Sequence, residues 1–299
     1  RLSKMGCHEA DVFFSKSKTS SCSSRLGKIE KKEESSTNEI GIRAIINKKQ
    51  SIVSTTNLEK QNVYNLIEKV VEMAKVVPEN QYCGLAESDK IKQVSKQEVK
   101  QLDICDPYEP TMSLIEKEVI KLEESALDNK EITNSEGAEI AYSKNSICLL
   151  GSNGLEIEME KTHSDFIIAV LAGSKDSMER EYDYKSKVFY NELGDFEKIG
   201  KEVSQNAIKK LNSRKLKTCK SDVIFDSKVS SSLLRNLFSA SNAQSIVKGI
   251  SFLKDKMNNK VFNDRISIID DPLMPKKLRS KISDCEGIQS KKKFLIEKG

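Results

Sequence analysis

The side chains that most often bind catalytic metals are scarce in this chain, because its only histidines are His8 and His163. A zinc-hydrolase helix of the HExxH type needs two imidazoles about one turn apart, with a carboxylate that activates the metal-bound water. His8 is followed by Glu9, but Val12 and Phe13 stand where the second histidine would fall. A zinc centre built from both histidines and distant carboxylates stays open as an alternative. The simpler interpretation is that both are ordinary surface or strand residues.

Other catalytic motifs are equally weak. The seven cysteines form no C-x-x-C pair and their number is odd, which favours free thiols in a reducing cytosol over a zinc ribbon. His163 could serve as the base for a remote cysteine, but nothing in the sequence pairs them. The stretch Gly151 to Gly154 lacks the Lys and Ser/Thr of a P-loop, and Asn153-Gly154 favours a hairpin turn.

Composition excludes several classes of protein. The charge of +5 is the remainder of 50 basic and 45 acidic residues mixed along the chain, and tryptophan is absent, so we expect no nucleic-acid binding. No window approaches the ~18 uninterrupted apolar residues of a membrane-spanning helix, and residues 1–9 contain no apolar core of a secretory signal. We therefore expect a soluble cytoplasmic protein without membrane partners. The chain starts at Arg1 without Met, so the sequence could be a fragment.

The elements that must position any site begin with short β-like runs, punctuated by turn residues, at 11–15, 20–25, 27–34, 40–46 and 51–54. These predict a meander of antiparallel strands. A helix is predicted to follow, with Asn57 as N-cap and Pro78 beyond its end. Residues 1–77 thus form one unit of strands and a helix, and the proline-rich segment 78–110 is predicted to be a linker or long surface loop.

A second unit, residues 111–217, repeats this pattern. A capping box of Ser113 and Glu116 predicts a helix, and the runs 139–150 and 155–161 form a hairpin around Asn153-Gly154. Further strands are predicted at 166–172 and 185–190, with a closing helix from about Phe196 to Leu211. Residues 218–299 start a third domain that lacks its full set of partners, with strands at 222–226 and 266–269 and a helix at 229–240. The fold class is therefore α+β, with antiparallel sheets packed against long helices in two repeated units.

The most unusual polar stretch runs from Ser177 to Tyr184 and alternates charges with tyrosines. Such a run could line a binding channel. More often it is a solvated edge strand whose charges discourage aggregation, and we prefer that interpretation.

Several of these stretches, in their order along the chain, resemble the PmbA/TldD family and its TldE (PmbA) branch. The resemblance is carried by residues 10–13 (ADVF), 25–30 (RLGKIE), 40–43 (IGIR), 54–58 (STTNL), 133–138 (TNSEGA), 178–184 (MEREYDY), 214–216 with 223–225 (RKL and VIF), and 284–287 (DCEG). The family continues well beyond the region reached at Gly299, so the resemblance implies a chain truncated at its C-terminus.

The resemblance implies a heterodimer of TldD-like and TldE-like subunits that cleaves unfolded or leader peptides, with an older association to modulation of DNA gyrase. In TldD-like chains a helix carries HExxxH, and a later cysteine completes the zinc site. Here Arg235 and Asn236 stand where His and Glu would be, and Ala240 replaces the second His. The resemblance therefore implies no catalytic or metal-binding residue in this chain and a zinc ion in a TldD-like partner.

We expect a TldE-like subunit that binds a TldD-like partner and helps to hold an extended peptide, with backbone hydrogen bonds of strand addition. Two alternatives remain at this point. One is a truncated, inactive remnant or a stand-alone binding module, and the other is a zinc peptidase that acts alone.

Overall fold

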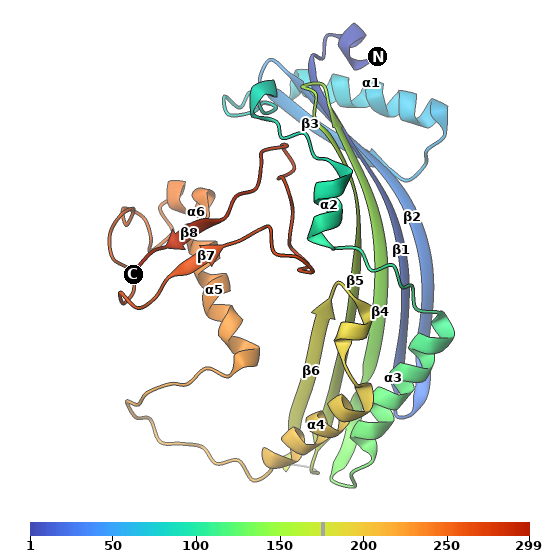
Figure 1. The fold of residues 1–299 in the computed structure, drawn as a ribbon, viewed down its shortest axis with the longest axis vertical. Coiled ribbons are helices and arrows are strands. Elements are labelled where there is room, and N and C mark those ends of the chain that lie inside the picture. Colours follow the sequence, from blue (N-terminus) through green and yellow to red (C-terminus); the bar gives the residue numbers. More distant parts are fainter. Residues whose placement is uncertain (175–176) are drawn as a thin grey trace. The chain divides into compact units, whose positions relative to one another are not determined.

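The computed structural model describes residues 1–174 and 177–299, which form two compact units. The larger unit contains residues 1–212 and 271–291, and the smaller contains residues 213–270 and 292–299. Figure 1 labels their elements along the chain. No helix among the described residues is both long and apolar enough to cross a membrane.

One antiparallel sheet of six strands, in the order β3-β2-β1-β4-β5-β6, forms the larger unit. Its first three strands are β1 (Glu9–Arg25), β2 (Lys28–Ile46) and β3 (Lys49–Thr55), and the other three are β4 (Ile132–Gly151), β5 (Glu156–Ala172) and β6 (Glu179–Lys187). The two halves join where β1 pairs with β4, from Asp11↔Gly151 to Ser24↔Ala138. The two repeated units expected from the sequence are therefore fused into one sheet.

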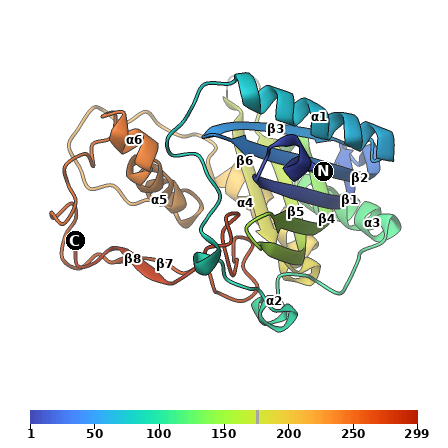
Figure 2. The same cartoon turned by 90° about the horizontal axis from the view of Figure 1, so that it is seen from above.

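Helices cover one face of this sheet, at both ends of the long strands (Figure 1). Even-numbered residues of β1 lie on that face: Ala10 shares a buried cluster with Val70 and Val71 of α1 (Lys60–Val76), and Cys22 belongs to the cluster under α3 (Met112–Leu127) and α4 (Phe196–Lys209). Burial of these apolar faces is the main term that stabilises the unit. Figure 2 shows α1 and α3 beside the sheet from above.

The opposite face is polar along most of β1, with Ser15, Ser17 and Thr19 only partly buried. At one end it is covered by the segment that leads into α2 (Lys96–Leu102), because Ile91 and Val94 pack on Leu155 and Ile157. The segment 78–110 is therefore packed along part of its length and contains helical structure, including a short 3-10 helix at Ser88–Lys90. Leu2–Met5 and Tyr190–Leu193 also form short 3-10 helices.

The smaller unit contains α5 (Ser227–Ser241), α6 (Ala243–Val247) and the short pair β7 (Ile268–Asp270) and β8 (Lys293–Ile296). The strand predicted at 222–226 was wrong, because these residues have no partner strand among those described. Ile224 is 95% exposed. A short apolar run forms a strand only where a neighbour takes its backbone hydrogen bonds.

Two helix starts also differ from the predictions. α3 is capped by Thr111, whose hydroxyl accepts the Leu114 N–H at 3.3 Å, rather than by Ser113. α1 begins two residues later than Asn57 would set it, because the Asn57 side chain accepts the Glu59 N–H in a local turn. In both cases the residue predicted as N-cap is of a type that favours helix caps. The local backbone geometry places the start of the helix at a different residue.

Candidate functional site

The helix expected to carry the family's zinc motif is formed as predicted. Asp226 caps α5, since its carboxylate accepts the Lys228 N–H at 2.8 Å. Leu237 is its one buried residue, whereas Leu233, Leu234 and Phe238 are between 43% and 49% exposed. The helix therefore presents a largely exposed apolar face within the smaller unit.

Arg235, Asn236 and Ala240 all lie on α5, the first two exposed and the third partly buried. Among the described residues, one bond joins this trio to a residue outside the helix: the Ala240 carbonyl accepts the Ser251 hydroxyl at 2.6 Å. Zinc needs imidazole, thiolate or carboxylate ligands, while a guanidinium is a donor only and a methyl group offers nothing. These residues do not fit a zinc ion. Over residues 1–174 and 177–299, no three His, Cys, Asp or Glu side chains gather in a metal-binding arrangement.

The two histidines occupy unremarkable positions in the larger unit. His8 is exposed just before β1. His163 lies on β5 with Nε2 at 3.6 Å from Asp165 Oδ1, too long for a direct hydrogen bond. Burial raises the pKa of Asp165, and the facing His163 opposes that shift. In the described part of the chain, neither histidine is joined by the further ligands that a metal centre needs.

Three of the seven cysteines are also poor nucleophiles by environment. Cys7, Cys22 and Cys83 are buried, and burial raises the pKa of each thiol. Because the thiolate is the reactive form, a raised pKa makes these groups inert near neutral pH.

Residues 179–184 of the charged and tyrosine-rich stretch lie in β6, at the edge of the sheet, which confirms the prediction of an edge strand. Its Arg180 forms a two-pronged ion pair with Glu136, at 2.8 and 2.7 Å, and this pairing raises the pKa of the guanidinium. The guanidinium carbon lies 5.2 Å from the centre of the Tyr182 ring, which stacks on Tyr184 with centroids 6.2 Å apart. The stretch is thus an ordered row of one cation and two rings along the sheet edge.

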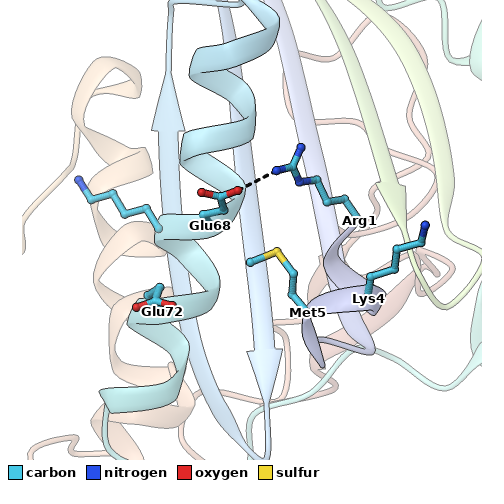
Figure 3. Close-up of a pocket in the computed structure, with 6 residues that line it drawn as sticks. Arg1, Lys4, Met5, Glu68 and Glu72 are labelled. Carbon is cyan, nitrogen blue, oxygen red and sulfur yellow. Dashed lines mark hydrogen bonds and ion pairs between the residues drawn. The ribbon is translucent and has the colours of Figure 1, made fainter.

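A cavity of about 560 Å³ lies beside the N-terminus, lined by Arg1, Lys4, Met5, Glu68, Lys69 and Glu72 (Figure 3). Arg1 Nη2 donates to Glu68 Oε1 at 2.7 Å, and the same guanidinium lies over the Tyr64 ring. The cavity brings together no nucleophile and base. It therefore indicates no catalytic site.

A second cavity, of about 530 Å³, lies between α2 and the first half of β5. The sequence reasoning missed it because α2 falls in the segment interpreted as a linker. A signal was present: Ser95 and Glu98 form a full capping box, in which Ser95 Oγ accepts the Glu98 N–H and Glu98 Oε2 accepts the Ser95 N–H.

Comparison with known families matches nearly the whole chain to three successive domain models. Residues 10–74 match the PmbA/TldA metallopeptidase domain 1, residues 88–211 the central domain and residues 218–299 the C-terminal domain of the same family. With the fused antiparallel sheet and its covering helices, these matches define the class: the chain belongs to the PmbA/TldD family.

Individual relatives agree with this assignment. The chain is 26% identical to the metalloprotease PmbA of Escherichia coli O157:H7 over 97% of its own length and 64% of the relative's. It is 27% identical to a PmbA homologue of Buchnera aphidicola from Acyrthosiphon pisum over 100% of its length and 66% of the relative's. A second Buchnera aphidicola PmbA homologue also matches. Across these three relatives, the chain spans 56 to 66% of the relative's length.

Solved structures show the same fold. TldE from Thermococcus kodakarensis superposes with a TM-score of 0.80 at 21% identity, over 100% of this chain and 66% of that one. A Bacteroides thetaiotaomicron protein named for modulation of DNA gyrase superposes with a TM-score of 0.89 at 21% identity, over 100% and 68% of the two chains.

Proposed function

We propose that this chain is a TldE/PmbA-like subunit of a TldD/TldE-type metallopeptidase, which binds unfolded or leader peptides for cleavage by a zinc-bearing partner. The observation that carries the proposal is the composition of α5 in a chain of this family. Arg235, Asn236 and Ala240 stand on a formed helix and offer no zinc ligand. Hydrolysis would then depend on a second, TldD-like subunit.

The chemistry left to this chain is to hold the substrate. Its larger unit presents a long antiparallel sheet with one largely polar face, which suits contact with extended polypeptide. Free thiols are consistent with assembly in the cytoplasm.

The test is co-expression of the tagged chain with a TldD-like subunit from the same source, followed by affinity purification, metal analysis and a peptidase assay. We expect a complex with about one zinc per TldD-like chain, and cleavage of an unstructured peptide by the complex only. The chain alone should carry less than about a tenth of a zinc. Failure of the two chains to associate, or hydrolysis by this chain alone, would refute the proposal.

The second candidate is a binding module with no peptidase connection, or an inactive remnant. The observation that favours it is the exposed apolar face of α5, because exposed apolar patches often mark binding surfaces. The same co-purification separates the two, because only the first requires a complex that gains peptidase activity.

A further inference from the structure

β5 is longer than the strand that covers its outer edge. β6 pairs with β5 only from Ser164↔Lys187 to Ala172↔Glu179, whereas β5 begins at Glu156. On the opposite side the whole of β5 pairs with β4. The first half of β5 therefore has an outer edge without a neighbouring strand.

The direction of the backbone groups at this edge follows from one observed bond. The Thr162 N–H donates outward, away from β4, to the Ile104 carbonyl at 3.1 Å. Backbone groups alternate in direction along an antiparallel strand, so the N–H and C=O of Glu158 and Glu160 point outward as well. Within the part of the chain that the structure describes, these four groups have no recorded hydrogen-bond partner.

This open stretch forms one wall of the cavity between β5 and α2, which we call the β5-edge groove: residues 96, 99, 100, 103–105, 107 and 158–160. The opposite wall is α2, whose Val99 contributes an apolar side chain. Ile104 and Cys105 line the groove where Thr162 ends the open edge. The groove is held in place by the capping box of α2 and by Leu102, which is buried with Ile104 and Ile282.

We infer that the β5-edge groove binds a short extended polypeptide segment by strand addition. The inference rests on the proposed function and names where this chain would hold its peptide. Two outward N–H groups alternate with two outward carbonyls in the plane of the sheet, a pattern that another strand matches. The volume of about 530 Å³ falls in the range of small-ligand sites.

The charges around the groove fit a ligand recognised through its backbone. Lys96 and Lys100 face Glu158 and Glu160 across it, so neither sign of charge dominates. The Lys96–Glu158 pair, at 3.4 Å, is 91% and 69% exposed, and such exposed pairs separate at little cost. The segment's side chains would meet Val99 on one side and solvent on the other, so sequence preference should be weak.

The first experiment uses the full chain and a six-residue Thr-Val repeat peptide with blocked ends. Hydrogen exchange is followed at the Glu158 and Glu160 amides, with and without the peptide. We expect exchange at both amides to slow at least about tenfold when the peptide saturates the chain, because each new hydrogen bond protects its donor. A peptide N-methylated at its two central residues should bind at least about tenfold more weakly, since it loses backbone donors.

The matched variants are Glu158→Pro and Glu158→Ala. Both remove the carboxylate and its pairing with Lys96, but only proline removes the outward N–H, which takes no part in the β4–β5 ladder. We expect Glu158→Ala to bind the peptide within about threefold of the unaltered chain and Glu158→Pro to lose about tenfold.

The outcomes separate the site from the function. If the peptide binds without slowing exchange at Glu158 and Glu160, or binds Glu158→Pro and Glu158→Ala with equal affinity, the β5-edge groove is not the binding site. The proposal that this chain is a peptide-binding subunit would be unaffected. If Glu158→Pro does not fold, the exchange measurement on the unaltered chain decides alone. If the peptide binds neither this chain nor its complex with a TldD-like subunit, the proposed function and the groove both fall.

Discussion

The buried carboxyl group of Glu123 on α3 should hold the β1–β2 hairpin in place, and its replacement by Gln offers a sharp test. Glu123 is fully buried. Its two oxygens accept the Leu26 N–H at 2.9 Å, the Gly27 N–H at 3.2 Å and the Ser135 hydroxyl at 2.6 Å. Leu26 and Gly27 both have positive φ, of 52° and 73°, as a tight two-residue turn between twisted strands requires.

Gln keeps the shape of the side chain but replaces one oxygen by an NH₂ group. That group must face a donor, so at least one bond is lost and a buried polar group is left without a partner. This costs about 2 kcal/mol of the free energy of unfolding. With a urea m-value of about 3 kcal/mol/M, the midpoint should fall by about 0.7 M.

The matched control is Glu124→Gln, because Glu124 is the exposed neighbour on the same helix. It should change the free energy of unfolding by no more than about 0.5 kcal/mol. A midpoint for Glu123→Gln within about 0.2 M of the unaltered chain would refute the reasoning.

Three further predictions concern packing, ion pairing and pH. Gly200→Ala should destabilise the larger unit by about 2 kcal/mol in urea unfolding, because the new Cβ would lie 2.0 Å from Ser125 Oγ and 2.3 Å from the Leu122 carbonyl oxygen. The control is Gly84→Ala, whose new Cβ meets only ordinary van der Waals contacts. Arg43→Met should lower the free energy of unfolding by about 3 kcal/mol, because it leaves the buried Asp11 carboxylate, which Arg43 Nε contacts at 2.9 Å, without its cation. A second substitution, Asp11→Leu, should recover part of that loss in the same assay. The Ser95 N–H and Lys92 lower the pKa of Glu98 to about 2. Its folded pKa lies below the ordinary glutamate value of 4.5, so it stabilises α2 above that value and this contribution is lost as the pH falls towards 2. The protection factors of the α2 amides, which correct for the intrinsic pH dependence of exchange, should fall over that window in the unaltered chain and not in Glu98→Gln.

The helices were predictable because their stabilising pattern is local. The apolar spacing of α1, α4 and α5 and the Asn153-Gly154 turn can be read from a few consecutive residues. The length of β1 could not be read this way, since its middle is a run of Ser, Lys and Thr with one face in solvent. What extends it is pairing on both sides with β2 and β4.

In the candidate site, too, features set by local sequence could be predicted and features set by distant contacts could not. The lack of imidazoles on α5 is a property of composition, so the sequence alone indicates that Arg235, Asn236 and Ala240 cannot bind zinc. The β5-edge groove depends on where β6 stops pairing with β5, and this register is set by contacts between distant residues. Only the Ser95–Glu98 capping box hinted that the proline-rich segment contains a helix that lines it.

The pairing of β1 with β4 sets the order of events during synthesis. Residue 24 of β1 must wait for residue 138 of β4, a separation of 114 residues. At translation rates of about 5–20 residues per second, one side of the first long strand stays uncovered for roughly 6 to 23 seconds on the ribosome. Lys16 and Lys18 lie in the part of β1 that pairs with β4, and charged side chains on an uncovered strand discourage a neighbouring nascent chain from pairing there before β4 arrives.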